Sequence, residues 1–213
     1  MTDVDAPKQP TRIQRERREE ILAAALDVFS AHGFRGASIN QIAERAGMST
    51  PRLLYHFEGK AALYQALLRD TILLWRKPLA AISPDGGPLT EIASYIRRKL
   101  EMSRDFPRES RLFAAEIMMG VPEARDAVFV PLTDTFHAKI ALIEAWMRDG
   151  LLKRHDPHHL IYSIWATTQH YADFEAQIAE LSPQKMPTLF ADAEAFLVPM
   201  YMAHLTPEAG ALR

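Results

Sequence analysis

Apolar residues recur every three or four positions in each long segment of this chain, a periodicity that is typical of amphipathic helices. No segment alternates apolar and polar residues for long enough to predict a strand. We therefore expect an all-α fold of about nine helices. Glycine or proline marks the breaks between them, which lie at 33–36, 83–88, 106–107, 120–122, 149–157 and 181–187.

The first predicted helix runs from 12 to 32 and ends at Gly33, a residue type that often follows the last turn of a helix. The side chains expected to face inward are spaced three or four residues apart. They are Ile21, Leu22, Ala25, Leu26 and Phe29.

Two short helices are predicted after this first one. Ser38 is followed three residues later by Gln41, which is the spacing of a capping box at a helix start. Gly47 ends that helix, and Ser49 caps the next one, which carries Pro51 in its first turn, where proline is tolerated. Two short helices joined by a glycine-containing turn indicate a helix-turn-helix.

The predicted organisation is a flexible basic tail at 1–11, a three-helix DNA-binding head at 12–60 and a helical effector-binding and dimerisation domain at 61–207. The chain has 213 residues, 48% of them hydrophobic, which is enough for a real core. It has no cysteine, which excludes disulfides and thiolate chemistry. We see no secretory signal and no long apolar run, so we expect a cytoplasmic protein without a membrane span.

One set of residues in the first third of the chain keeps the order, spacing and chemistry of a known family. The set comprises Ile21–Ala25, Phe29, Gly33, Phe34, Gly36, Ile42, Ala43, Ala46–Ser49, Leu53, Tyr55–Phe57, Lys60, Ala62 and Leu63. From about residue 15 to 68 the sequence resembles the TetR family of regulators. It departs from the family at Leu54, where many members have tyrosine, and at Glu58-Gly59, where Pro-Ser is more usual.

This resemblance implies a homodimer that places the third helix of each head in the major groove, at half-sites about one helical turn apart. On that helix Arg52 is able to make a bidentate contact with guanine, while Thr50 and Pro51 can meet a thymine methyl group. For His56, packing against the first helix is an equal alternative to binding DNA. The residues placed for phosphate contacts are Ser38, Ser49, Tyr55, His56 and Lys60.

Because the net charge is −2, any DNA-binding surface must be local. Basic residues cluster just before the helix-turn-helix, against a single acid, Glu16. Alone, such a run would be a solvated tail. In this position we expect it to lie along the DNA backbone or in the minor groove and to make binding sensitive to salt. Its members are Lys8, Arg12, Arg15, Arg17 and Arg18.

The second half of the chain places polar and amphipathic side chains within mainly apolar helices, which is how small-molecule pockets are built. For the residues of the segment 165–171, packing in the core or in a dimer interface is the alternative, since the two C-terminal helices form that interface in the family. The candidates for effector binding are Trp75, Tyr95, Lys99, Ser103, Arg111, Trp165, Thr168, Gln169 and Tyr171.

The segments 95–113 and 159–174 resemble those members of the family that regulate pyrimidine utilisation, which implies uracil or thymine as the effector. Trp165 and Gln169 lie one helical turn apart and so share a face. An indole ring can stack on a pyrimidine, and a glutamine amide offers a donor and an acceptor side by side.

Other functions have less support. The chain has no glycine-rich phosphate loop, no Gly-x-Ser-x-Gly elbow and no His-Glu-x-x-His pair, so we expect neither an enzyme nor a cofactor. A metal sensor would use the cluster at 155–159, where Asp156 more naturally caps the next helix and the histidines face water. A sensor of drugs, lipids or acyl-CoA would keep the fold but need a larger and more apolar cavity.

Overall fold

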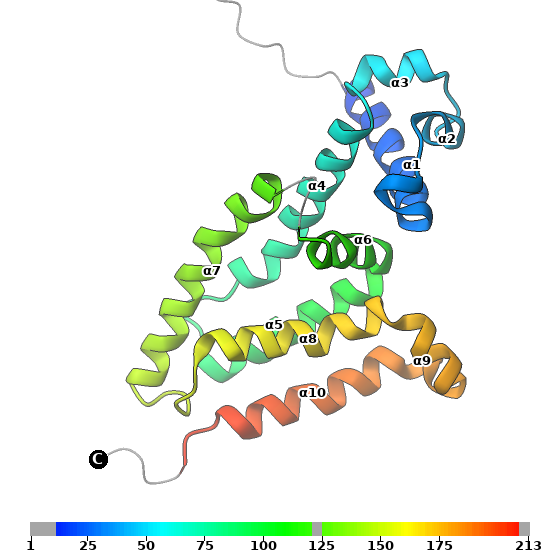
Figure 1. Cartoon of the computed structure of the whole chain (residues 1–213). Coiled ribbons are helices and arrows are strands. Elements are labelled where there is room, and N and C mark those ends of the chain that lie inside the picture. The colour runs from blue at the N-terminus through cyan, green and yellow to red at the C-terminus, as the bar shows by residue number, and fades with distance from the viewer. Residues whose placement is uncertain (1–11, 121–124, 209–213) are drawn as a thin grey trace, which may run out of the picture. The chain divides into compact units, whose positions relative to one another are not determined.

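The computed structural model describes residues 12–120 and 125–208, which form helices and no strand (Figure 1). The prediction of an all-α fold is thus confirmed. The chain divides into two compact units, Met1–Leu67 and Leu68–Arg213. The division falls inside a helix, α4 (Lys60–Ala80), whose first two turns belong to the first unit.

The first unit contains α1 (Arg12–Gly36), α2 (Ile39–Arg45), α3 (Thr50–His56) and the beginning of α4. Each helix contributes apolar side chains to a shared core, and the Phe29 ring meets the edge of Tyr64 with 4.8 Å between centroids. The members with no more than 1% of their surface exposed are Ile21, Ala25, Phe29, Ile42, Leu53 and Leu63.

Gly33 interrupts α1 where the sequence predicts the helix to end. Its φ of 65° and ψ of 175° are not helical, so the residues up to Gly36 form a separate short turn. Such a positive φ is readily adopted only by a residue without a Cβ. Gly47, with φ 64°, likewise makes the turn between α2 and α3.

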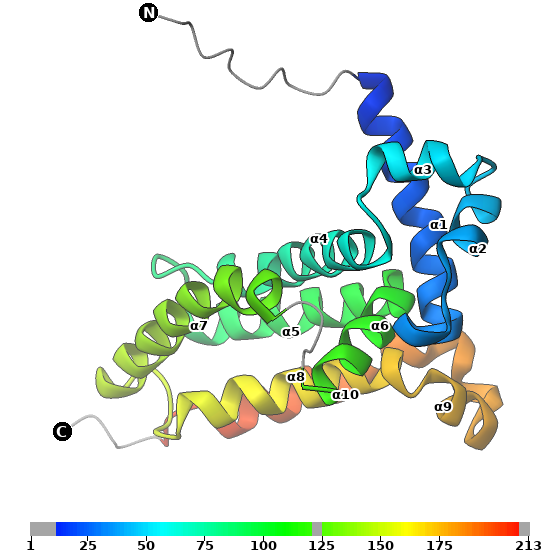
Figure 2. The same cartoon turned by 45° about the horizontal axis from the view of Figure 1, so that its top comes forward.

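The second unit is built around α5 (Pro88–Asp105), which packs against both α8 (Pro157–Asp173) and α10 (Leu189–Leu205) (Figures 1 and 2). α6 (Pro107–Met118) and α7 (Arg125–Arg148) also pack against α8. Buried apolar residues from these helices form one core, which includes Ile92, Ile96, Ile143, Trp146, Ile161, Ile164, Leu197 and Leu205.

The described residues contain ten α-helices, one more than the sequence analysis anticipates. The additional helix is α9 (Glu175–Leu181), separated from α8 by Phe174, whose φ of −115° and ψ of 24° end the helix. Neither glycine nor proline marks this break, so the sequence carries no signal for it. The break expected at 181–187 contains a 3₁₀ helix, η1 (Pro183–Thr188). Among the described helices, none is both long and apolar enough to cross a membrane.

Candidate functional site

Hydrogen bonds between neighbouring residues fix the start of α2, and one further bond joins α2 to α3. The backbone amide of Gln41 donates to Ser38 Oγ at 3.3 Å, and the amide of Ser38 donates to Gln41 Oε1 at 2.8 Å, so the predicted capping box is confirmed. Ser49 occupies the N-cap position of α3, although its side chain makes no capping hydrogen bond. Thr50 Oγ1 donates instead to Asn40 Oδ1 on α2, at 2.9 Å.

The helix α3 has a buried side and an exposed side. Leu53 is fully buried and Phe57, just after the helix, is 7% exposed, so both belong to the core of the first unit. Pro51, Arg52 and Tyr55 are exposed, Tyr55 to 81% of its surface. Within the described part of the chain no hydrogen bond or ion pair occupies the Arg52 guanidinium. These three side chains are therefore available to a partner molecule.

Lys60 and His56, both predicted to contact phosphate, are partly engaged by other residues of the first unit. Lys60 Nζ donates to the carbonyl oxygens of Phe34, at 2.8 Å, and Ala37, at 3.0 Å, and lies 4.6 Å from the centroid of the Phe34 ring. His56 is half-buried, with its ring edge-on to Tyr55. The Lys60 contacts join the start of α4 to the end of α1.

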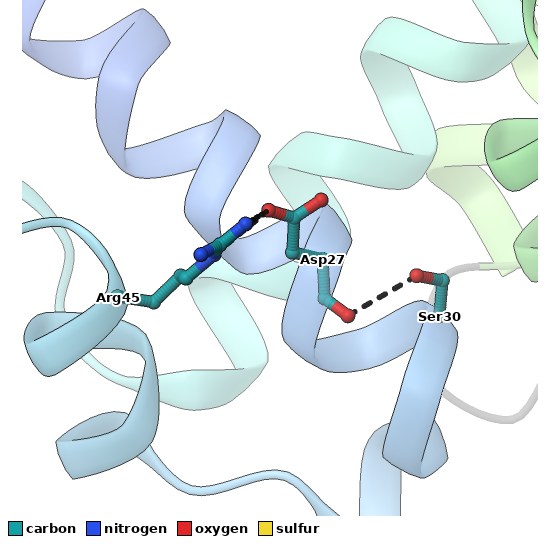
Figure 3. A network of polar contacts seen from close by, with 3 residues as sticks. All are labelled: Asp27, Ser30 and Arg45. Atoms are coloured by element: carbon teal, nitrogen blue, oxygen red, sulfur yellow. Dashed lines mark hydrogen bonds and ion pairs between the residues drawn. The ribbon is translucent and has the colours of Figure 1, made fainter.

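An ion pair that the sequence analysis did not single out joins α1 to α2 (Figure 3). Arg45 donates from Nε, at 2.9 Å, and from Nη2, at 2.7 Å, to Oδ2 of Asp27. Ser30 Oγ donates to the Asp27 carbonyl oxygen one turn away, at 3.2 Å. The pair is partly exposed, so its stabilisation is below about 1 kcal/mol. Its geometry nevertheless orients α2 on α1.

The predicted basic run is largely involved in contacts along α1. Arg12 pairs with Glu16 at 3.6 Å, Arg17 pairs with Glu20, and the Arg18 guanidinium lies 5.3 Å from the Phe57 ring centroid. These are surface contacts that cost little to exchange for phosphate. Lys8 lies outside the described residues.

The second unit encloses a cavity of about 50 Å³ between α4, α5, α6, α7 and α8. Five of the nine predicted effector-binding residues line it, namely Trp75, Tyr95, Lys99, Trp165 and Gln169. The other lining residues are apolar: Ile72, Leu79, Phe113 and Leu132. Apolar lining residues have the same helical spacing as core residues, so the sequence offers no signal that separates the two.

The polar groups of the cavity are arranged around two indoles. Trp165 Nε1 donates to Tyr95 Oη at 2.6 Å. Lys99 Nζ lies 5.6 Å from the centroid of the Trp75 ring, within the range of a cation–π interaction. Trp75 Nε1 is buried and has no hydrogen-bond partner among the described residues.

Burial shifts the ionisation of the cavity residues. Lys99 is 2% exposed, and loss of hydration lowers its pKa to about 7, although the negative charge of Asp173 opposes this shift. Burial also raises the pKa of Tyr95 above its usual value, so the phenol stays protonated. Near neutral pH, the cavity thus holds one amine that gains or loses its proton readily.

The remaining four predicted residues lie away from the cavity lining. Ser103 Oγ donates to the carbonyl oxygen of Thr168 at 2.9 Å, and Thr168 Oγ1 donates to that of Ile164 at 2.6 Å. Both side chains are buried; the Ser103 bond joins α5 to α8, and the Thr168 hydroxyl is bonded within α8. Arg111 Nη1 donates to the Ala172 carbonyl oxygen and to Glu175, both at 3.1 Å. Tyr171, in turn, packs against Phe190.

The histidine cluster before α8 has local partners. Asp156 caps α8 as predicted, by accepting from the backbone amide of His158 at 2.8 Å. The His155 ring stacks on His204 with 4.0 Å between centroids. In residues 12–120 and 125–208, no group of three or more histidine, aspartate or glutamate side chains converges as a metal site would require.

Comparison with known proteins identifies both units. The profile of bacterial regulatory proteins of the tetR family matches residues 21–67, and the profile of the YcdC-like protein C-terminal region matches residues 68–208. The Escherichia coli K12 HTH-type transcriptional regulator RutR is 49% identical over 162 residues, which cover 76% of each chain. The activator FasR of Mycolicibacterium smegmatis is 46% identical over 54 residues, 25% of each chain.

Solved structures show the same fold. SCO4942 from Streptomyces coelicolor superposes with a TM-score of 0.67 at 24% identity, covering 89% of this chain and 98% of its own. AibR, in complex with isovaleryl coenzyme A and operator DNA, superposes with a TM-score of 0.63 at 18% identity, covering 73% of this chain and 85% of its own. The matched profiles and the extent of the likeness to RutR show that the chain belongs to the TetR family of transcriptional regulators.

Proposed function

We propose that this regulator binds operator DNA through α3 and responds to a small planar effector, uracil or thymine, bound in the cavity of its second unit. TetR regulators bind operator DNA and small-molecule effectors, typically as dimers. We propose that it acts in the cytoplasm as a regulator, most simply a repressor, and not as an enzyme.

The cavity carries the proposal for the effector. Its volume of about 50 Å³ is far below the roughly 300–1,000 Å³ of drug-sized sites, which favours a small ligand over an acyl-CoA. Its lining combines the faces of Trp75 and Trp165 with the amide of Gln169. Flat faces and an amide are what a ring with adjacent donors and acceptors requires.

The effector is tested by thermal-shift titration with uracil, thymine, cytosine and a fatty acyl-CoA. A ligand at 100 times its Kd stabilises the native state by about 2.7 kcal/mol. We expect uracil or thymine to raise the Tm and the acyl-CoA to leave it unchanged. A rise with the acyl-CoA alone would instead support the alternative effector class.

Replacing Gln169 with alanine is expected to abolish the shift produced by uracil, because the amide lines the cavity and supplies both a donor and an acceptor. The variant should remain dimeric and bind DNA. Gln177→Ala, which removes the same amide from an exposed position of α9, is the matched control and should keep the shift. If Gln169→Ala becomes monomeric in sedimentation, the side chain serves the subunit interface instead.

For DNA, we propose that Arg52 reads a guanine and that Thr50, Pro51 and Tyr55 complete the contact surface. The exposure of α3 and the unoccupied guanidinium in the described structure support this assignment. Ser49, at the N-terminus of α3, can still donate to a phosphate, whereas the amide and hydroxyl of Ser38 already donate to Gln41 Oε1. We leave Lys60 out of this surface, because its ammonium donates to two carbonyl oxygens of its own unit.

The operator for this test is selected from random DNA by the wild-type protein. Arg52→Ala should weaken binding to it by roughly 10–100-fold, because one bidentate contact with a base is lost. Binding to random DNA should weaken much less. Arg69→Ala, which removes an exposed charge from α4 outside the helix-turn-helix, is the control in the same electrophoretic mobility-shift assay. Equal losses on both DNAs would show that Arg52 contacts a phosphate.

We propose further that α8 and α10 form the dimer interface. Exposed apolar side chains follow both helices: Tyr162 is 46% exposed, Phe196 66% and Met200 40%. A charge introduced at this surface would be buried without a partner in the dimer. Phe196→Asp should therefore sediment as a monomer, whereas Met118→Asp, at a 79% exposed position of α6, should not. A dimer that survives Phe196→Asp would contradict this assignment.

A further inference from the structure

The side chain of Lys99 is an amine buried beside the cavity without a direct counter-ion. It projects from α5, is 2% exposed and lines the cavity together with Trp75, whose ring it faces at 5.6 Å. In the described residues, no hydrogen bond or ion pair joins its Nζ to another side chain or to the backbone. A buried polar group of this kind is costly unless something satisfies it.

The acid whose charge acts on Lys99 has its hydrogen bond elsewhere. Asp173 on α8 attracts Lys99 through space, but its Oδ1 accepts from Ser110 Oγ on α6 at 2.6 Å. Asp173 is also under the influence of Arg111 and His170, and burial raises its pKa above the usual value. Of the remaining groups facing the amine, Tyr95 on α5 is protonated and Trp75 on α4 is neutral. The amine is therefore left to interact with whatever occupies the cavity.

The cavity as a whole offers mainly hydrogen-bond donors. The Tyr95 oxygen already accepts from Trp165, so its own proton is available for donation. Trp75 Nε1 is a buried donor without an acceptor, and a lysine ammonium can only donate. Among the lining side chains, Gln169 alone carries a free carbonyl oxygen. A matching ligand therefore presents several acceptor atoms and few donors.

We propose that Lys99 determines the effector specificity of this cavity by donating to a carbonyl oxygen attached to the effector ring. This contact selects a planar ring that carries an oxo group there and rejects the analogue that carries an amino group instead. This inference rests on the proposed pyrimidine effector and names the group that would recognise it. An amino group at that position would place a donor against the ammonium, so this analogue could bind only the neutral amine and would lack the charge-assisted hydrogen bond that the oxygen accepts.

This role has a signature in proton uptake. An oxygen acceptor on the effector stabilises the charged form of Lys99. At pH 7 and above, part of the effector-free protein has lost the Lys99 proton, so binding of the effector takes up a proton. Affinity for a neutral ring should consequently fall as the pH rises, by roughly tenfold between pH 7 and 8.5. A lysine that only fills space would produce neither effect.

The test is isothermal titration of the full-length protein with uracil at pH 7.5 in phosphate and in Tris, whose ionisation enthalpies differ. We expect net proton uptake for the wild type and for Lys77→Met, which removes an exposed lysine of the same unit. Lys99→Met should lose at least roughly tenfold in affinity, and Lys99→Gln, which keeps a neutral donor, should bind uracil without proton uptake. Circular dichroism and sedimentation establish that each variant is folded and dimeric.

Cytosine and isocytosine each carry an amino group in place of a different carbonyl oxygen of uracil. One of the two should bind the wild type at least roughly tenfold more weakly than uracil, and Lys99→Gln should narrow that gap. If uracil binds without proton uptake and Lys99→Met binds it with the affinity of the wild type, the role proposed for Lys99 is wrong. The pyrimidine effector would stand in that case. Absence of uracil and thymine binding to the wild type would overturn the pyrimidine effector itself, and the specificity proposal with it.

Discussion

Lys99→Met is expected to make the unliganded protein more stable than the wild type at pH 6, by a few kcal/mol and at most about 5 kcal/mol. Burial lowers the pKa of Lys99 from 10.5 to about 7. Each tenfold change in proton affinity is worth about 1.4 kcal/mol, and methionine has a similar length without a charge to desolvate.

The sign follows from proton binding. Between about pH 7 and 10.5 the unfolded chain holds a proton at Lys99 that the folded chain lacks, so wild-type stability rises with pH across this window. Stability from this group is complete above pH 10.5 and is lost as the pH falls to about 7. The difference in free energy of unfolding between Lys99→Met and the wild type should therefore be constant below about pH 7 and shrink above it.

Urea unfolding of both proteins at pH 6, 7.5 and 9 measures this difference. Tryptophan fluorescence is a suitable probe, because the three tryptophans, Trp75, Trp146 and Trp165, all belong to the second unit. Lys77→Met, at an exposed position, should follow the wild type at each pH. A wild type as stable as Lys99→Met at pH 6 would mean that the amine is hydrated or paired in solution.

Phe29→Ala is expected to abolish DNA binding while leaving effector binding in place. Phe29 is 1% exposed in the core of the first unit and meets Tyr64 edge-on. Truncating a buried phenylalanine costs about 3–5 kcal/mol, a large fraction of the stability of a unit this small. The second unit has its own core and should remain folded.

Two probes separate the units in this variant. Far-ultraviolet circular dichroism should show an early loss of helix, whereas the tryptophan transition and the uracil titration should match the wild type. Ile13→Ala removes apolar side chain from a position that is 70% exposed, and should change neither transition. A parallel loss of tryptophan signal in Phe29→Ala would mean that the two units unfold together.

The local features of the head could be predicted because their partners are close in sequence. Ser38 and Gln41 are three residues apart, and Gly47 requires a backbone conformation that favours glycine. The same reasoning missed the Asp27–Arg45 pair, since its members are 18 residues apart on different helices. It also could not show that Lys60 would donate to the carbonyl oxygens of Phe34 and Ala37.

For the cavity, polar residues in apolar helices were the useful signal. Trp75, Lys99 and Gln169 stand out in their helices and do line it. Ser103 and Thr168 stand out equally, yet the Ser103 hydroxyl donates to a carbonyl oxygen of α8 and the Thr168 hydroxyl donates to one within its own helix. A side chain that binds a ligand and a side chain that bonds to a buried neighbour are of the same residue types. Only the positions of the helices distinguish the two roles.

The sequence by itself determined the helical class, the helix-turn-helix, the main breaks and the family, because periodicity, capping and glycine turns act over a few residues. The tertiary structure decided which side chains line the cavity and which form hydrogen bonds to other parts of the protein. It placed Lys99 beside Trp75 and bound Asp173 to Ser110, so that within the described residues the amine has no hydrogen-bond partner. These two contacts join residues 24 and 63 positions apart, and their energies depend on burial and distance, which no local pattern encodes.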